Sequence, residues 1–192
     1  MRPLSLVIIN GSPNARSKTG SLAGLIANTL AEMVPLTVRQ VNVHELGPGF
    51  TEVSRREDTS PLVEAELRAI EGADLLIAAT PVYRGSYSGM FKHLFDLVDQ
   101  YALANKTVIL AATGGSDRHA LVIEHALRPL LGFFQAAVAP VGYYVSASDF
   151  DGTTILNSEV YSRIQIGLSD IVPQLELLAN TEVSPASLLT ES

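Results

Sequence analysis

Residues 11–21 place hydroxyl groups, glycines and two cations in one short segment. The hydroxyls come from Ser12, Ser17, Thr19 and Ser21, and the positive charges come from Arg16 and Lys18. The segment lies between an apolar run at 4–9 and an amphipathic stretch at 22–33, so it joins a predicted strand to a predicted helix. The first N–H groups of a helix have no intrahelical partner and lie at the positive end of its dipole. The segment therefore predicts a phosphate site.

This loop differs from the common nucleotide-binding motifs. Lys18-Thr19 lacks the glycine spacing of a Walker A loop, and the segment is not a G-x-G-x-x-G sequence. An ordinary strand-to-helix turn is the alternative interpretation, because Gly, Ser and Asn are common in turns.

A second unusual loop follows the apolar run at 75–79. It contains Pro81, Val82, Tyr83 and Arg84, with Ser86 further on. We expect the backbone amides near Val82 and Tyr83 to face a cleft, where a planar ring with polar edges would fit. A turn whose tyrosines cap the sheet edge is the alternative.

A third loop follows the apolar run at 107–112 and contains Thr113, Gly114, Gly115 and His119. Paired glycines let the backbone approach a ligand closely. The alternative is a plain turn before the next helix, with His119 a helix N-terminal residue that does no chemistry.

The elements that must position these loops alternate along the chain. Five apolar runs predict buried strands at 4–9, 36–41, 75–79, 107–112 and 138–145. Helical stripes lie between or after them at 22–33, 62–70, 90–98, 121–134 and 160–178. This alternation predicts an α/β, doubly wound parallel sheet with helices on both faces. Five strands favour the flavodoxin-like order 2-1-3-4-5 over a Rossmann sheet, which normally has six.

In a flavodoxin-like sheet the three loops meet at one edge, beside the switch in strand order. One loop suits a phosphate, one a flat heteroaromatic ring, and one the remaining ring edge or a sugar chain. Together they predict FMN as the ligand.

Composition limits the class of protein. The chain has 192 residues, 13 Lys and Arg against 20 Asp and Glu, and a net charge of −7, which disfavours nucleic acid or an anionic membrane as a partner. It has no cysteine, which excludes disulfides and thiolate metal sites, and we expect no metal. We expect one cytoplasmic domain over residues 1–179 and a flexible tail over 180–192. The long polar loop at 47–61 indicates a mobile segment or an interface arm.

The three loops also resemble a known family, the NAD(P)H-dependent FMN reductases. The resemblance rests on Gly11-Ser12-Pro13, Thr80-Pro81-Val82-Tyr83 and Thr113-Gly114-Gly115, and it covers residues 4–145. It is strongest to the branch that serves two-component monooxygenases acting on alkanesulfonates and methanesulfonate. The resemblance implies a homodimer or homotetramer, with FMN and either NADH or NADPH. Hydride transfer then belongs to the nicotinamide and the flavin, and no acid–base residue is required.

The same resemblance assigns roles to individual residues. The phosphate role falls on Ser12, Ser17, Lys18, Thr19, Gly20 and Ser21. The ring-edge role falls on Pro81, Val82, Tyr83, Arg84 and Ser86. The far edge of the ring falls to Thr113, Gly114 and Gly115, with His119 beside them.

Pro129 stands inside the predicted fourth helix, where its ring conflicts with the carbonyl of His125. Relatives often carry a π-bulge in this helix, at an oligomer interface near the flavin, and such bulges frequently mark functional sites. A tyrosine occupies the bulge in the alkanesulfonate-linked relatives. His125 stands there in this chain, which resembles the methanesulfonate-linked branch. The alternative is a polar helix residue with no function.

The predicted function is therefore reduction of FMN by NAD(P)H, with delivery of the reduced flavin to a partner monooxygenase in sulfonate or sulfur assimilation. We expect backbone N–H groups near Val82–Arg84 to stabilise the reduced ring. Arg16 and Arg84 are candidates for contact with the 2′-phosphate of NADPH. The alternatives are a quinone or azo-type reductase with tightly held FMN, a flavodoxin-like electron carrier, or a nucleotide-binding module without a redox role.

Overall fold

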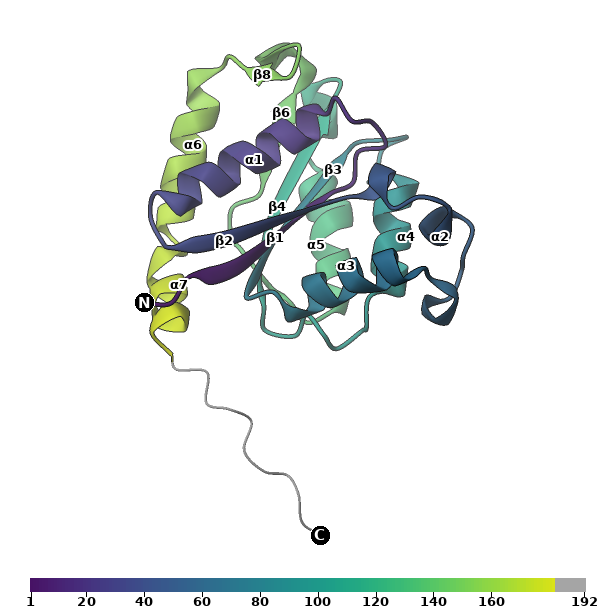
Figure 1. Cartoon of the computed structure of the whole chain (residues 1–192). Coiled ribbons are helices and arrows are strands. Elements are labelled where there is room, and N and C mark those ends of the chain that lie inside the picture. Colours follow the sequence, from purple (N-terminus) through teal and green to yellow (C-terminus); the bar gives the residue numbers. More distant parts are fainter. Residues whose placement is uncertain (182–192) are drawn as a thin grey trace.

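A parallel β-sheet forms the centre of the molecule (Figure 1). The structure is a computed structural model that describes residues 1–181. The sheet strands are β1 (Leu4–Asn10), β2 (Leu36–Asn42), β3 (Leu75–Pro81), β4 (Thr107–Gly114), β5 (Ala137–Val138) and β6 (Tyr143–Ser146). Their order is β2-β1-β3-β4, with β5 and β6 both paired to β4. The predicted flavodoxin-like order 2-1-3-4-5 is confirmed.

Helices cover both faces of the sheet (Figure 1). They are α1 (Lys18–Ala31), α2 (Pro48–Thr51), α3 (Pro61–Gly72), α4 (Gly89–Leu97), α5 (Arg128–Phe133), α6 (Ser158–Ser169) and α7 (Val172–Asn180). Successive strand residues point to opposite faces. Leu6 and Ile8 therefore pack in the core beneath α1, α6 and α7, whereas Val7 and Ile9 pack in the core beneath α3, α4 and α5. Burial on both faces explains why the strands are apolar runs and not alternating sequences.

The fifth sheet position is interrupted, which corrects the single strand predicted over 138–145. β5 pairs with Thr107 and Val108, and β6 resumes the pairing opposite Ala111. Pro140 lies in the gap and has no N–H to donate to a ladder. The carbonyls of Ala139 and Pro140 accept hydrogen bonds from Arg128 at 3.1 and 3.2 Å, which satisfies them without a strand partner.

The last helical stripe is also divided, because α6 ends at Ser169 and α7 begins at Val172. Pro173 lies in the first turn of α7, where a missing N–H costs nothing. The two helices still place Ile164, Leu168 and Leu175 in one core, so the predicted stripe is right and its continuity is wrong.

The long polar loop at 47–61 folds back on the domain. It contains α2 and a 3₁₀ turn at Arg56–Asp58. Phe50 of α2 is fully buried, with its ring 4.7 Å from that of His93. Arg56 forms ion pairs with Glu64 and Glu71 of α3. The segment is polar and irregular in sequence, but Phe50 and Arg56 hold it against the rest of the domain.

A π-helical turn spans Ile123–Leu127 directly before α5, so the bulge expected from Pro129 is present. The Arg128 N–H bonds to the Ile123 carbonyl across five residues. The wider turn places Pro129 at the start of α5, which relieves the conflict between its ring and the preceding turn. His125 lies within this turn and is exposed.

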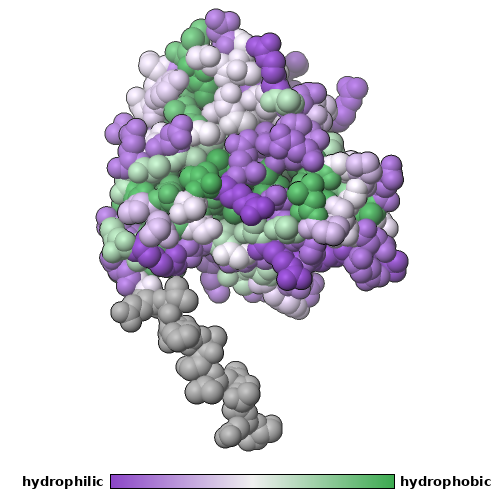
Figure 2. All heavy atoms as spheres, in the orientation of Figure 1, coloured by the Kyte–Doolittle hydropathy of each residue, from purple (hydrophilic) through white to green (hydrophobic). Residues whose placement is uncertain are grey.

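The face of the molecule seen in Figure 2 is mostly polar, with hydrophobic patches at the level of β2. Val38 of β2 is 47% exposed. No helix within residues 1–181 is long and apolar enough to cross a membrane. The predicted tail begins at Asn180, the last residue of α7, and otherwise lies outside the described residues, apart from Thr181.

Candidate functional site

The three predicted loops meet in a cleft of about 300 Å³ at the carboxyl ends of β1, β3 and β4. The sheet register explains the meeting, because Asn10 ends β1 beside Ala79, and Pro81 ends β3 beside Thr113. The cleft is lined by Ser12, Asn14, Arg16, Ser17, Lys18, Thr19, Pro81, Val82, Tyr83, Thr113, Gly114, Gly115 and Ala147. Its volume is at the lower end of the range for ligand pockets.

The first loop presents the start of α1 to this cleft. Ser17 is the N-cap, and its hydroxyl accepts the Gly20 N–H at 2.9 Å. The Ser21 N–H bonds to the Ser17 carbonyl. The N–H groups of Lys18 and Thr19 have no protein acceptor among the described residues, as expected for the first turn of a helix. They are therefore available to an anion at the positive end of the helix dipole.

Asn10 fixes both ends of this loop. Its side-chain oxygen accepts the Ser12 N–H at 3.2 Å and the Ser17 hydroxyl at 3.4 Å. Its side-chain nitrogen donates to Asn42 of the neighbouring strand at 3.0 Å. Asn10 is only 2% exposed, so these bonds form in a dry environment where losing one is costly. Sequence reasoning missed this residue, because a lone Asn at a strand end gives no signal of its partners.

Two cations flank the loop. The Lys18 ammonium lies 5.3 Å from the centre of the Phe150 ring, with the Ala147 carbonyl oxygen 3.5 Å away. The exposed Arg16 side chain takes part in none of the ion pairs of residues 1–181. Both cations thus retain donors for a phosphate.

The Thr19 hydroxyl, which the sequence analysis assigns to the phosphate, is bonded to another side chain instead. It lies 2.6 Å from the Thr113 hydroxyl, and both side chains are buried, at 1% and 6% exposed. This bond ties the β1–α1 loop to the end of β4. Thr19 therefore offers its backbone N–H to the cleft, while its hydroxyl serves mainly to hold two loops together.

The second loop corrects an expectation about free amides. The Val82 N–H donates to the Thr113 carbonyl at 2.7 Å, and the Tyr83 N–H donates to the Ser86 carbonyl at 2.8 Å. Tyr83 and Ser86 close a tight turn in which Arg84 and Gly85 have φ of 49° and 84°. Two successive positive φ values are typical of a type I′ turn. The N–H groups of Val82 and Tyr83 are therefore already engaged and do not face a ligand.

In the third loop, Gly114 leaves room for the side chain of Tyr144. A Cβ added at Gly114 would lie 2.2 Å from the Tyr144 hydroxyl oxygen. That hydroxyl donates to the Ser116 carbonyl at 2.5 Å. Burial raises the pKa of Tyr144, and the nearby carboxylates of Asp117 and Asp149 act in the same direction, so the phenol keeps the proton it donates.

Five predicted residues lie outside the lining of this cleft. Gly20 and Ser21 line the neighbouring cavity instead, on the β2 side of the loop. Arg84, Ser86 and His119 line neither cavity. Arg84 and Ser86 belong to the tight turn beyond Tyr83, and His119 ends a 3₁₀ turn at Asp117–His119.

The cleft also has a wall that the sequence did not predict. Ala147 follows β6, and the hairpin of β7 (Phe150–Asp151) and β8 (Thr154–Ile155) comes next. In a parallel sheet the fifth strand ends at the same edge as the other strands. This topology could have indicated that the segment after the fifth strand borders the cleft. The sequence at 146–149 is short and polar, and it has no pattern that distinguishes it from an ordinary loop. Asn14 and Arg16 also line the cleft; the sequence indicates Arg16 as a cation of the first loop and gives no signal for Asn14.

Comparison with known proteins agrees with this geometry. Residues 4–151 match the family described as NADPH-dependent FMN reductase. An NADH-dependent FMN reductase, SfnF, from Pseudomonas fluorescens is 42% identical over 172 residues, covering 90% of this chain and 92% of the relative. An FMN reductase (NADPH) from Pseudomonas aeruginosa is 40% identical over 171 residues, covering 89% and 92%.

Solved structures share the same architecture. An oxidoreductase from Corynebacterium diphtheriae superposes with a TM-score of 0.79 at 29% identity, covering 92% of this chain and 99% of that one. The apo form of the NADH:FMN oxidoreductase EmoB superposes with a TM-score of 0.76 at 27% identity, covering 89% of each chain.

Fold and site together define a flavodoxin-like protein with a polar cleft beside the start of α1, at the switch in strand order. Within that class, the chain belongs to the NADPH-dependent FMN reductase family. It is accordingly an NAD(P)H:FMN oxidoreductase.

Proposed function

We propose that this protein reduces FMN in the cleft described above and releases it to a separate flavin-dependent monooxygenase of sulfonate metabolism. In this proposal, residues 1–179 form one FMN-binding domain, which works as a homo-oligomer in the cytoplasm. One observation carries the proposal. The start of α1, which can bind an anion, lines the same cleft as the loops after β3 and β4, which leave room for a flat ring. The resemblance to sulfonate-linked reductases supports the choice of partner.

In this proposal the FMN phosphate lies at the start of α1. The N–H groups of Lys18 and Thr19, the Ser12 hydroxyl and the Lys18 ammonium bind it. The flavin ring lies between the loops at Pro81 and Gly114. Bound FMN supplies the hydride acceptor, and the protein contributes position and charge. No side chain in the cleft is required as an acid or base.

The size of the cleft supports exchange over permanent retention. A site of about 300 Å³ encloses less than a typical cofactor pocket, so part of the flavin remains exposed to a nicotinamide and to solvent. The alternative, a reductase with tightly held FMN, is favoured by one relative, an FMN-dependent NADPH-azoreductase of Staphylococcus aureus that is 29% identical. Dialysis separates the two proposals, because a tight complex stays yellow and an exchanging one loses its colour.

The test is steady-state oxidation of NADH and of NADPH at a series of free FMN concentrations. We expect a rate that rises with free FMN and saturates. A rate that is independent of added FMN contradicts the exchange role. Absence of NAD(P)H oxidation with FMN, quinone and azo acceptors alike contradicts the reductase role and favours an electron carrier.

A matched pair of variants tests the phosphate site. Lys18→Met removes the ammonium from the cleft, whereas Lys92→Met removes an exposed lysine that pairs with Asp96 on α4. We expect Lys18→Met to raise the KM for FMN by about tenfold, the value of one charge-assisted hydrogen bond, and to leave the KM for riboflavin unchanged. Lys92→Met changes neither. Equal effects on FMN and riboflavin would place the phosphate elsewhere.

A further inference from the structure

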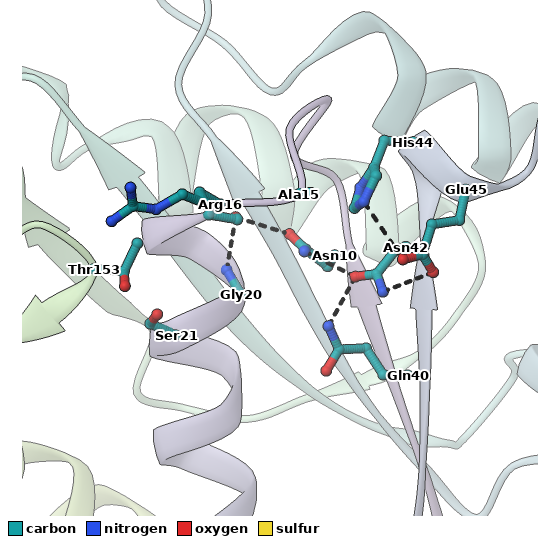
Figure 3. Close-up of a pocket in the computed structure, with 11 residues that line it drawn as sticks. Asn10, Ala15, Arg16, Gly20, Ser21, Gln40, Asn42, His44, Glu45 and Thr153 are labelled. Carbon is teal, nitrogen blue, oxygen red and sulfur yellow. Dashed lines mark hydrogen bonds and ion pairs between the residues drawn. The ribbon is translucent and has the colours of Figure 1, made fainter.

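A chain of hydrogen bonds joins the phosphate loop to the end of β2, along a cavity of about 400 Å³ (Figure 3). Asn10 and Asn42 are the last residues of β1 and β2, and the sheet register places them opposite each other. Nδ2 of Asn10 donates to Oδ1 of Asn42 at 3.0 Å. Nδ2 of Asn42 in turn donates to the carboxylate of Glu45, also at 3.0 Å. Asn42 and Glu45 line this cavity and not the cleft that receives the flavin.

Each amide in this chain is satisfied in one orientation. A backbone N–H only donates and a carboxylate only accepts, whereas an amide side chain has one end of each kind. The Ser12 N–H requires the oxygen of Asn10 to face the loop. The nitrogen of Asn10 then faces β2, where the oxygen of Asn42 accepts from it. The nitrogen of Asn42 is left for Glu45, which can only accept. Asn42 therefore stabilises the orientation in which the oxygen of Asn10 faces the loop.

Burial makes Asn10 dependent on Asn42. Asn10 is 2% exposed, and the described residues offer its nitrogen no acceptor other than Asn42. Without that acceptor the nitrogen would be unsatisfied in a place that water does not reach, which is costly. Rotation of the Asn10 amide would reduce this cost, but Ser12 and Ser17 would then lose the oxygen that they share. Ser17 is the N-cap of α1, so the change would reach the first turn of the helix.

We propose that Asn42 is a positioning residue for the FMN phosphate. It holds the amide of Asn10, which holds Ser12 and Ser17 and thereby the loop that leads into α1. This inference rests on the proposed function, in which the phosphate lies at the start of α1. Asn42 lies outside the lining of the cleft, so its effect on FMN passes through Asn10. The effect is limited to the phosphate, because the side chain of Asn42 makes no hydrogen bond to the loops after β3 and β4.

The test compares FMN with riboflavin, which has the same ring and no phosphate. Asn42→Leu changes the volume of the side chain little and removes the acceptor on which Asn10 depends. The Kd for each flavin is measured by titrating protein into flavin and following flavin fluorescence. We expect Asn42→Leu to raise the Kd for FMN about fivefold, the value of one hydrogen bond, and to change that for riboflavin less than about twofold. Equal changes for both flavins, or no change for FMN, would overturn the inference.

Two further variants separate the acceptor from the general structure of this region. Gln40→Leu is the matched control, because Gln40 donates to the same oxygen of Asn42 at 2.7 Å but is exposed and does not bond to Asn10. It should leave both Kd values unchanged. Asn42→Asp keeps an acceptor for Asn10, and Glu45, whose side chain is 63% exposed, can turn its carboxylate into solvent. We expect Asn42→Asp to bind FMN within about twofold of the wild type. Binding as weak as in Asn42→Leu, in either variant, would overturn the inference.

A double-mutant cycle tests whether Asn42 acts through Asn10. Asn10→Leu should raise the Kd for FMN at least as much as Asn42→Leu does. The double variant should bind FMN no more weakly than Asn10→Leu alone, because the second substitution has nothing left to disturb. Independent effects that multiply would overturn the inference. If circular dichroism shows that Asn42→Leu is unfolded, Asn42→Ser takes its place in the cycle, since its hydroxyl is too short to reach Asn10.

Failure of this inference can be distinguished from failure of the proposed function by Lys18→Met. If Lys18→Met and Asn42→Leu each weaken FMN and riboflavin equally, the phosphate does not lie at the start of α1, and the proposed placement is wrong. If Lys18→Met weakens FMN alone and Asn42→Leu has no such effect, the placement holds and only the role of Asn42 is overturned.

Discussion

The buried hydroxyl pair of Thr19 and Thr113 offers a prediction in which stability and site geometry are linked. The two oxygens lie 2.6 Å apart and join the start of α1 to the end of β4. Thr19→Val and Thr113→Val each remove one hydroxyl with little change of side-chain volume. Each single variant leaves the other hydroxyl in a buried site, at 1% or 6% exposure, without its partner.

The magnitude follows from that orphaned group. An unsatisfied buried hydroxyl costs about 1–3 kcal/mol, whereas removing both partners of a bond is nearly neutral. We therefore expect each single variant to lose about 1.5 kcal/mol and the double variant to lose less than the sum of the two by at least about 1 kcal/mol. For a chain of this size, 1.5 kcal/mol lowers the Tm by about 3–6 °C.

Urea denaturation of the wild type, both single variants and the double variant provides the double-mutant cycle. The m-value should stay constant, because the surface exposed on unfolding is the same. Ser162→Ala is a suitable control, since its hydroxyl lies on the exposed face of α6. Strictly additive losses for Thr19→Val and Thr113→Val would refute the reasoning, because they would show that the two hydroxyls do not depend on each other.

Three further predictions concern the walls of the site and the base of the sheet. Gly114→Ala forces a Cβ against the Tyr144 hydroxyl and should lower stability by about 1–3 kcal/mol and raise the KM for FMN. Adding Tyr144→Phe to this variant removes the clashing hydroxyl and should restore part of the stability and part of the affinity for FMN. If thermal melts show no restored stability in the double variant, the clash is not the cause. Ser17→Ala removes the N-cap of α1 and should lower stability by about 1 kcal/mol in urea, together with a higher KM for FMN; an unchanged midpoint would show that the cap is dispensable. Hydrogen bonding by Arg2 lowers the pKa of Asp74, so this carboxylate stabilises the fold above its unfolded pKa of about 4, and that stability is lost as the pH falls through the lower folded value. Asp74→Asn should therefore reduce the difference in stability between pH 7 and pH 3, and an unchanged difference would contradict it.

Much of the fold was predictable because burial on both faces leaves a strong pattern. Runs such as residues 75–79 of β3 are apolar along their length, and the alternation of runs with helical stripes leaves few possible sheet orders. The interruptions were not predictable in detail. Pro140 divides the fifth strand and Pro173 starts a new helix, and whether a proline ends an element depends on how neighbouring groups satisfy the freed carbonyls.

The site was predictable at the level of loops and less so at the level of atoms. Parallel strands bring the ends of β1, β3 and β4 to one edge, so the three loops had to meet. Which hydrogen-bonding groups remain free depends on contacts across the sheet, such as the Val82 N–H on the Thr113 carbonyl. The role of Asn10 depends in the same way on Asn42, which lies 32 residues away. The spacing of these residues along the chain does not predict which of them form hydrogen bonds with one another.

The most direct measurement of the central claim is a crystal structure of the protein soaked with FMN. We predict the phosphate within hydrogen-bonding distance of the N–H groups of Lys18 and Thr19, and the ring between Pro81 and Gly114. The Thr19 and Thr113 hydroxyls should keep their mutual bond in that complex. FMN density elsewhere, or a phosphate remote from the start of α1 in an otherwise occupied cleft, would contradict the account.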